Sequence, residues 1–396
     1  MYCKKSVLLS LVQERAYRKT LKAFFYIHGG IKAREDLVLL SFLSLILFLT
    51  KLFIEVRKMK RNWGVTYLLA IILLLATACG NSSTSTKEDG SKSQPIKIGF
   101  SALPSWYLWH LVEEKGFFKK HGVDVELVWF PVYADSLSAL NTGKIDANSQ
   151  ALIDTISPIE KGVDLKVVFI TDNSLGGDGL VATKDIKTVA DLKGKKVGTE
   201  IGTIEHFFML TALKEAGLSE SDVKFTNLTV QDAGNSFIAG KLDAAGLWEP
   251  FLSMAVEKGK GHKLVTSADF PGLIADVFVV REEILNTRKE DIQKIVAAWF
   301  DAVNYLSNHY DESIQLIAEQ AGISKEELDA GMKGFKLFSP EENIRAFQEG
   351  NTYQSIYYTA RKNAEFLKEL GFIQEIPDLD QLVDQTFINE EIRRNK

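Results

Sequence analysis

The sequence predicts an α/β protein built from two similar lobes that are joined by two crossing segments. Strand-like and helix-like stretches alternate through residues 95–171, and repeated strand–helix units favour a mostly parallel sheet covered by helices. The pattern Gly-Lys-apolar-Asp-Ala occurs at residues 143–147 and again at 240–244, each time between a predicted helix and a predicted strand. A chance match of so short a pattern is the alternative, but both halves also open with a strand, a polar loop and a helix in the same order. These observations favour two α/β lobes with a cleft between them.

The composition is that of a globular protein with room for a large core. Of the 396 residues, 46% are hydrophobic and 25% are charged. The formal net charge of −5 gives no reason to expect a nucleic-acid partner. The two cysteines, Cys3 and Cys79, are too few for a disulfide framework, a zinc cluster or a CxxC redox site, so we expect neither a metal nor a cofactor.

The segment before the predicted fold has the pattern of a lipoprotein signal peptide. Residues 59–62 form a short basic segment, residues 64–78 carry no charge, and small residues lead directly to Cys79. We therefore expect residues 59–78 to be removed and a lipid on Cys79 to anchor the exported chain to the outer face of the cytoplasmic membrane. A transmembrane anchor is the alternative, but the uncharged run is short for a bilayer span. Residues 79–95 are mostly small and polar, as in a flexible tether.

Residues 1–58 do not fit this arrangement. They hold a second apolar run at residues 37–49, and charged residues interrupt it soon afterwards. We favour a start assigned too early, with Met59 as the true first residue, and a genuine upstream membrane span is the alternative. Peptides from residues 1–58 in the native protein would exclude the early-start interpretation.

The first lobe is predicted to open with alternating strands and helices. Its predicted strands are residues 95–100, 123–129, 146–149 and 165–171, and its predicted helices are residues 106–115, 135–141 and 152–161. A strand at residues 275–280 returns the chain, and the sequence from residue 286 onward is helical. Capping-box patterns at Thr287, Ser324 and Ser339 mark three helix starts, the last with proline at the first helical position. We therefore predict lobe 1 as residues 96–181 with 277–396, lobe 2 as residues 182–276, and a hinge at the strands near Val181 and Val277.

The stretch from residue 195 to residue 217 is the clearest candidate for a ligand loop. It contains a predicted strand at residues 196–199, a polar loop at 200–203 and a helix whose apolar face holds Ile204, Phe207, Phe208 and Ala212. Thr203 is placed to cap the helix start, and Gly217 is placed to end the helix. Backbone N–H groups, the positive end of the helix dipole and the hydroxyls of Thr199 and Thr203 would then meet and bind a small anion. An ordinary strand–turn–helix unit is the alternative.

Segments from both lobes resemble one family, the extracytoplasmic solute-binding proteins of the nitrate, taurine and alkanesulfonate type. The segments are, in chain order, IGFSALPSWYLWHLVEEKGFFKKHGVDVELV, DLKGKKVGTEIGTIEHFFMLTALKEAG and AGLWEPF, and the resemblance covers residues 96–385. It implies a type II periplasmic-binding-protein fold and a monomer that is not an enzyme. Such a protein delivers a small solute to the permease and ATPase subunits of an ABC importer.

Two other functions stay open. The first is an enzyme of the thiamine-precursor kind, but the sequence shows no nucleophile–base pair, no metal cluster and not the cysteine-rich motif of the eukaryotic synthases in that related branch of the family. A sensor or an adhesin could reuse the same fold, because a fold does not fix a function.

Candidate ligand-binding residues come from loops that follow strands and from helix N-termini that face the cleft. They are Ser101, Trp106, Tyr107, Tyr133, Gln150, Asp154, Gly202, Thr203, Glu205, His206, Trp248, Glu249 and Asp276, with Asp135, Asn173 and Asp178 as further candidates. Each has a structural alternative, such as core packing for the aromatic residues, an ordinary hydrogen bond for His206 and surface charge for Glu249.

The charge of the candidate residues bears on the solute. No arginine occurs between Arg61 and Arg281, so an anion in the cleft would depend on helix termini and hydroxyls. The carboxylates of Asp154, Glu205 and Glu249 instead indicate a solute with a positive group. A zwitterion such as taurine satisfies both ends, and nitrate and alkanesulfonates belong to the same class. The alternative solute is a heterocyclic thiamine-precursor pyrimidine stacked on Trp106 or Trp248, or a cationic amine.

Overall fold

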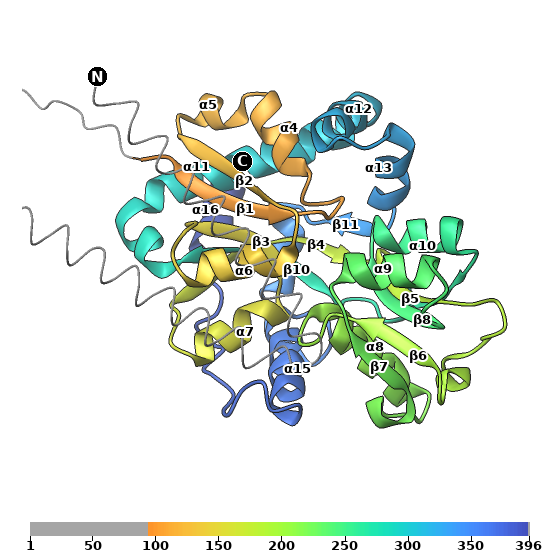
Figure 1. Ribbon diagram of the computed structural model, residues 1–396. Coiled ribbons are helices and arrows are strands. Elements are labelled where there is room, and N and C mark those ends of the chain that lie inside the picture. Colours follow the sequence, from red (N-terminus) through yellow and green to blue (C-terminus); the bar gives the residue numbers. More distant parts are fainter. Residues whose placement is uncertain (1–93, 395–396) are drawn as a thin grey trace, which may run out of the picture. The chain divides into compact units, whose positions relative to one another are not determined.

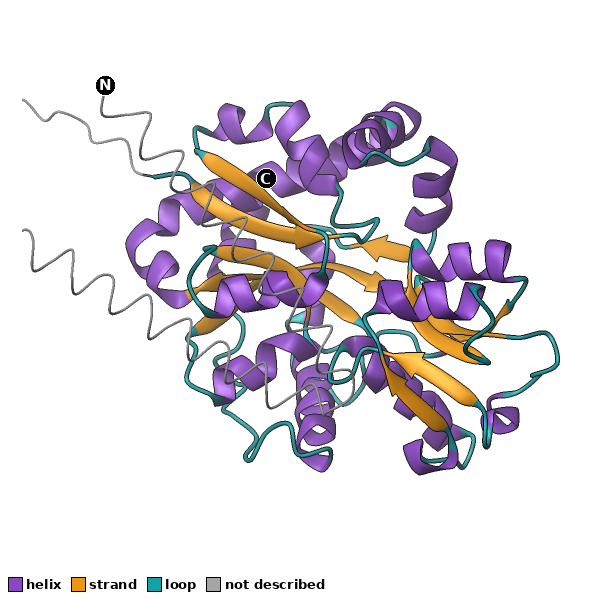
Figure 2. Ribbon diagram, viewed as in Figure 1, coloured by secondary structure: helices purple, strands orange, loops and turns teal. Residues whose placement is uncertain are grey.

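The computed structural model describes residues 94–394, which form two lobes (Figure 1). The predicted extension, the signal peptide, Cys79 and most of the tether lie outside these residues. Each lobe contains one β-sheet with helices around it, so the predicted α/β class is confirmed (Figure 2). Within residues 94–394, no helix is long and apolar enough to cross a membrane.

The first lobe is organised around a six-stranded sheet in the order β11-β4-β10-β3-β1-β2. β1 is parallel to β2 and β3, whereas β10 is antiparallel to both of its neighbours, β3 and β4. The strands are β1 (Ile96–Ser101), β2 (Val125–Phe130), β3 (Ala147–Ala151), β4 (Leu165–Ser174), β10 (Ala275–Arg281) and β11 (Phe335–Leu337). The predicted return strand is therefore present, and it lies at the centre of the sheet.

Helices cover this sheet, and two tryptophans from them fill its core. The helices are α4 (Leu108–Glu114), α5 (Phe117–His121), α6 (Tyr133–Asn141), α7 (Ile153–Glu160), α11 (Glu282–Asn308), α12 (Tyr310–Ala321), α13 (Lys325–Met332), α14 (Pro340–Ala346), α15 (Ile356–Glu369) and α16 (Thr386–Arg394). The rings of Trp109 and Trp299 lie 4.5 Å apart between centroids, and Phe278 of β10 lies 5.2 Å from Trp109. The Trp109 indole donates to Ser149 Oγ at 2.9 Å. Because the buried N–H has a partner, the full apolar area of this ring contributes to stability.

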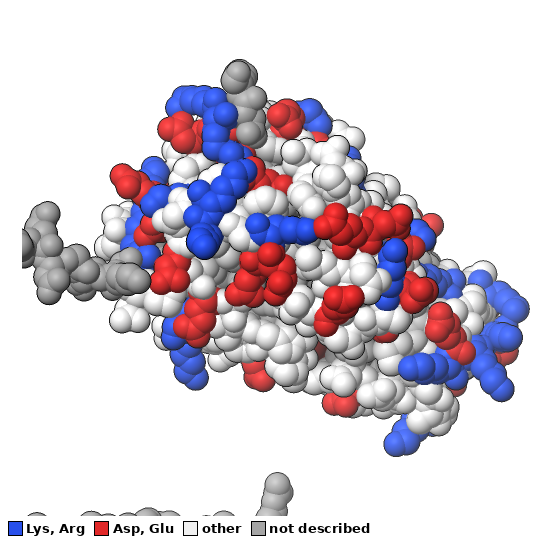
Figure 3. Space-filling view, turned by 90° about the horizontal axis from the view of Figure 1, so that it is seen from above, with Lys and Arg blue, Asp and Glu red and all other residues white. Residues whose placement is uncertain are grey.

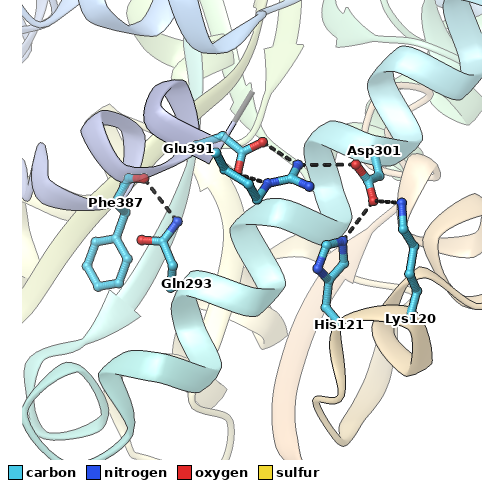
Figure 4. Close-up of polar contacts among 7 residues, drawn as sticks. Lys120, His121, Gln293, Asp301, Phe387 and Glu391 are labelled. Carbon is cyan, nitrogen blue, oxygen red and sulfur yellow. Dashed lines mark hydrogen bonds and ion pairs between the residues drawn. The ribbon is translucent and has the colours of Figure 1, made fainter. Parts of the chain in front are cut away.

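The C-terminal helix α16 packs on α11 through polar contacts that tie three parts of the first lobe together (Figure 4). Asp301 of α11 accepts hydrogen bonds from Lys120 at 2.6 Å, from Arg394 at 3.1 Å and from the ring of His121 at 2.7 Å. Gln293 donates to the Phe387 carbonyl at 3.1 Å. These contacts fix the end of the described chain on the first lobe.

The second lobe has a five-stranded sheet in the order β7-β6-β8-β5-β9. Its elements are β5 (Asp178–Ala182), β6 (Lys196–Thr199), α8 (Ile204–Glu215), β7 (Lys224–Asn227), α9 (Val230–Ile238), β8 (Ala244–Trp248), α10 (Phe251–Gly259) and β9 (His262–Thr266). The predicted strand at 196–199 is confirmed, and the predicted apolar face of α8 is buried. Gly217 follows this helix with φ +74°, a conformation that suits glycine.

The chain crosses between the sheets at residues 175–177 and again at residues 267–274. Val181 lies in β5 of the second sheet and Val277 in β10 of the first, so the crossings come a few residues before the strands that the sequence indicated. The two crossings are joined, because Ser267 Oγ lies 2.7 Å from Ser174 Oγ and accepts from the Gly176 N–H at 2.7 Å. The two segments that connect the lobes are therefore hydrogen-bonded to each other.

Two of the three predicted helix starts are confirmed. Ser324 accepts from the Glu327 N–H, and Ser339 forms a complete capping box with Glu342. The prediction at Thr287 is wrong as a cap. α11 begins earlier, at Glu282, and the Thr287 hydroxyl donates to the Glu283 carbonyl inside the helix. The backbone does break the helical geometry at the next residue, Arg288, with φ −134°.

Candidate functional site

A cavity lies between the two sheets, and both lobes contribute to its wall. It has about 40 Å³ of room for water-sized molecules, within about 590 Å³ of unfilled space that includes open solvent. The wall is formed by residues at the ends of strands and the starts of helices: Ser101, Ala102, Leu103, Trp106, Pro131, Val132, Tyr133, Ala151, Asp178, Glu200, Ile204, Thr229, Val230, Gln231, Trp248, Phe251 and Asp276. A small molecule bound in this cavity would contact both lobes.

Three aromatic side chains form a connected part of this wall. Trp106 lies in the loop after β1, Tyr133 begins α6, and Trp248 ends β8, so the three come from both lobes. The Tyr133 ring lies 5.6 Å from Trp106 and 5.6 Å from Trp248, at 83° to the latter. Tyr133 is fixed at its other end, because its hydroxyl donates to Asp154 at 2.6 Å and accepts from the Ala151 N–H at 2.9 Å.

Two buried aspartates face the cavity from the strands nearest the crossings. Asp276 lies on β10 opposite Asp172 of β4, and Asp178 starts β5 opposite Trp248 of β8. Both carboxyls are about 3% exposed. The antiparallel registers of β10 and β5 thus place one carboxyl from each sheet at the cavity.

Each of these aspartates interacts with a second carboxyl behind it. Burial, followed by the charge of Asp172, holds the pKa of Asp276 well above its usual value, and burial raises the pKa of Asp172 to about 7. Burial raises the pKa of Asp178 to about 6, and burial together with Asp178 holds the pKa of Glu205 well above its usual value. Two carboxyls can share a hydrogen bond only when one is protonated, so each pair holds a proton near neutral pH.

The remaining acids at the cavity are occupied by the protein itself. Glu249 accepts from Lys263 Nζ at 3.0 Å and from the hydroxyl and N–H of Ser253, in the first turn of α10. Burial raises the pKa of Glu200, and a hydrogen bond from the Val230 N–H, at the start of α9, opposes that shift. Two helix N-termini that could have met an anion therefore already hold carboxylates of the chain.

The predicted anion-binding loop is not arranged as expected. Thr203 does occupy the N-cap position of α8, but its hydroxyl donates to the Glu200 carbonyl at 2.8 Å and caps no N–H group. The Thr199 hydroxyl donates to the Gly246 carbonyl at 3.0 Å. Both hydroxyls are used inside the second lobe, and neither residue lies on the cavity wall.

The structure brings together five of the predicted site residues on the cavity wall, namely Ser101, Trp106, Tyr133, Trp248 and Asp276, together with the further candidate Asp178. Asp154 and Glu205 lie behind this wall, in contact with Tyr133 and Asp178. Other predicted residues lie elsewhere. Tyr107 packs against Trp129 and His110, Gln150 bonds to Asn148 and Thr155, and His206 bonds to Glu220 and the Gly202 N–H.

Several wall residues were missed, among them Pro131, Val132, Glu200, Thr229, Gln231 and Phe251. One of them carried a usable signal. Thr229 is followed three residues later by Asp232, and it accepts from the Asp232 N–H at 3.2 Å as the N-cap of α9. That pattern marks a helix start, and helix starts line this cavity. Within residues 94–394, no group of three or more histidine, cysteine or acidic side chains is placed to hold a metal ion.

A family model described as "NMT1/THI5 like" matches residues 110–313, and the chain belongs to this family. Among curated relatives, the "Putative aliphatic sulfonates-binding protein" of Escherichia coli K12 is 30% identical over 64% of this chain and 80% of its own length. The "Taurine-binding periplasmic protein" of the same strain is 24% identical over 69% of this chain and 86% of its own length.

A solved structure supports the type II periplasmic-binding-protein fold. The periplasmic aliphatic sulphonate binding protein SsuA from Escherichia coli matches with a TM-score of 0.63 and 24% identity, over 74% of this chain and 92% of that one. The predicted fold and family are therefore both confirmed.

Proposed function

We propose that this chain is an exported, lipid-anchored solute-binding protein of an ABC importer. The observation that carries the proposal is the cavity whose wall comes from both lobes and lies beside the two crossing segments. A solute bound there touches both halves, so it stabilises the closed arrangement over an open one. Relatives named for binding sulfonates and taurine support this role.

The role proposed is binding and not catalysis. The two relatives described above are named as binding proteins, and a receptor needs to hold and release its solute unchanged. Its partners would be the permease and ATPase subunits of the importer, and the receptor itself would act as a monomer. Taurine, for which one relative is named, is a zwitterion and carries a positive group that could face Asp178 and Asp276.

Binding can be measured through the protein's own fluorescence. Trp106 belongs to the first lobe and Trp248 to the second, and both line the cavity, so a solute that closes the lobes changes the surroundings of both indoles. Titration with taurine and with an extract of small cellular solutes should give a saturable change in tryptophan emission and a higher melting temperature. Absence of both effects with every fraction of the extract would contradict a receptor role.

The lipid anchor can be tested in the native cell. Changing Cys79 to alanine should move the protein from the membrane fraction to the soluble fraction, because the proposed lipid is attached there. Cys3→Ala is the matched control and should leave the protein on the membrane if Met59 is the true start. Membrane retention of the Cys79→Ala protein would contradict the anchor.

A further inference from the structure

We propose that the solute held between the lobes carries a positively charged nitrogen group, bound by Asp178 and Asp276 and enclosed by the faces of Trp106, Tyr133 and Trp248. This inference rests on the proposed receptor function and narrows it to a chemical class. It covers organic cations and zwitterions that present their cationic end to the two aspartates, and it excludes simple anions.

The charge of the cavity wall is the first support. Its charged members are Asp178, Glu200 and Asp276, and the wall contains no lysine or arginine. Lys263 lies near, but its ammonium is paired with Glu249 at 3.0 Å. The face of the protein in Figure 3 carries side chains of both signs, whereas all the charged members of the cavity wall are negative.

Atoms without partners are the second support. Among the described residues, Ser101 Oγ and Trp106 Nε1 are buried without a hydrogen-bond partner, and both residues line the cavity. A buried hydroxyl or N–H group without a partner is costly, and polar atoms of a solute would satisfy both groups. The Trp106 N–H would serve an acceptor atom elsewhere on the same solute. These atoms indicate a missing polar partner inside the cavity.

An anion meets unfavourable groups in this cavity. The first turns of α9 and α10 already hold the carboxylates of Glu200 and Glu249. An anion would lie near Asp178 and Asp276 without a guanidinium or ammonium to offset their charge, and like charges in a buried site repel strongly. Aromatic faces add attraction for a cation, because their electron-rich centres favour positive charge.

Because carboxyls at the cavity titrate, this inference predicts the direction in which pH changes the affinity for the solute. The acidic side chains that face the cavity or lie directly behind it are Asp154, Asp172, Asp178, Glu200, Glu205, Glu249 and Asp276. Of the other titratable groups nearby, Lys263 is paired with Glu249, and burial keeps Tyr133 protonated. As the pH rises through about 6 and 7, the carboxyls of Asp178, Asp154 and Asp172 ionise. A cation should then bind more tightly, and an anion less tightly.

Paired probes test the inference directly. Taurine and ethanesulfonate differ by the amine, and choline and 3,3-dimethylbutan-1-ol differ by the charge. We expect taurine to raise the melting temperature of the wild-type protein more than ethanesulfonate does, or choline more than 3,3-dimethylbutan-1-ol does. The increase should be larger at pH 8 than at pH 5.5. We expect Asp178→Asn to weaken that binding at least tenfold, whereas Asp124→Asn, a change at an exposed site, leaves it unchanged. Ethanesulfonate binding as tightly as taurine, or more tightly at low pH, would overturn the inference while leaving a receptor function intact.

A second readout needs no ligand. Burial raises the pKa of Asp178 to about 6, so at pH 8 the ligand-free protein carries a buried negative charge there, and Asp178→Asn should raise its melting temperature relative to Asp124→Asn. If Asp178→Asn instead lowers it, the carboxyl serves the fold and the inference is wrong. Failure of every probe to bind counts against the proposed receptor function. The comparison of melting temperatures between Asp178→Asn and Asp124→Asn still tests the inference about a positively charged group at Asp178.

Discussion

At the scale of single residues, the site depends on carboxyls that the fold brings together from distant parts of the chain. Sequence reasoning placed Asp276 and Trp248 near the solute because both stand at strand ends. It could not pair Asp276 with Asp172 or Asp178 with Trp248, because those neighbours follow from the antiparallel registers of β10 and β5. Register between strands far apart in the chain has no local sequence signal.

Glu205 gives a prediction about pH and stability. Its carboxyl is fully buried, and burial with Asp178 holds its pKa well above the usual value near 4.3. The folded protein therefore keeps this proton to a higher pH than the unfolded chain does. The stabilisation is complete below pH about 4 and is lost as the pH rises toward the folded pKa. Glu205→Gln removes this loss and should raise the free energy of unfolding at pH 8 by about 1–3 kcal/mol.

Urea denaturation of the ligand-free protein at pH 5 and pH 8 checks this expectation. The gain from Glu205→Gln should be smaller at pH 5, where the unfolded carboxyl is closer to half-protonated. Glu375→Gln, at an exposed position, is the control and should change little at either pH. A Glu205→Gln protein that is less stable than wild type at pH 8 would show that the acid itself is needed by the fold.

Substitutions at Trp248 and Thr203 distinguish between two solute sites, the observed cavity and the predicted anion-binding loop. Trp248 lies on the cavity wall, whereas the Thr203 hydroxyl donates to the Glu200 carbonyl inside the second lobe. Trp248→Ala should weaken binding of the solute at least tenfold, because it removes one aromatic wall. Thr203→Ala should leave affinity within about twofold, as titration by intrinsic fluorescence or calorimetry would show. Equal losses from both changes would restore the anion-loop hypothesis.

At the scale of helices and strands, local signals were predictable and tertiary choices were not. Ser324 and Ser339 cap their helices because the cap involves only the next three residues. Thr287 carries the same pattern but lies inside α11, which begins at Glu282 and breaks its helical geometry only at Arg288. Thr203 stands at the right position, yet its hydroxyl prefers a carbonyl that the preceding loop presents. Position along the helix was predictable, and the choice of hydrogen-bond partner was not.

The capping box at Ser339 supplies a test at this scale. Its hydroxyl accepts from the Glu342 N–H at 3.2 Å, and Glu342 accepts from the Ser339 N–H at 2.9 Å. Ser339→Ala should lower the free energy of unfolding by about 1 kcal/mol, because an N–H group at the start of α14 loses its partner. Thr287→Ala is the comparison and should cost less, since that hydroxyl only donates within α11. Chemical denaturation of both variants measures the difference, and a larger cost at Thr287 would contradict this account of the two positions.

At the scale of the whole described chain, neighbouring side chains pack closely around the segments that cross between the two lobes. Gly177 lies at the first crossing, and its carbonyl accepts from the Glu249 N–H at 2.8 Å. A β-carbon added there would lie 2.3 Å from the Phe335 ring of β11. Residues 176–179 read Gly-Gly-Asp-Gly in the sequence, but the close approach of Phe335, far along the chain, could be seen only in the folded protein.

Gly177→Ala should therefore strain the connection between the lobes. We expect a loss of about 1–3 kcal/mol in the free energy of unfolding, typical of forcing a methyl group into a filled space, and a weaker affinity for solute. Gly234→Ala is the matched control, because its added β-carbon would meet neighbours at 3.7 Å or more. Denaturation and solute titration on both variants check this. A Gly177→Ala protein as stable as the control would mean that Phe335 moves aside freely.

The account as a whole depends on which chemical group the two lobes enclose. A crystal structure of the protein isolated from its own cells, with its solute retained, addresses this most directly. We predict solute density between Trp106, Tyr133 and Trp248, with a positively charged nitrogen at hydrogen-bond distance, about 2.7–3.2 Å, from Asp178 or Asp276. A sulfonate, nitrate or other anionic group at those two carboxyls, or a solute bound outside this cavity, would contradict the account.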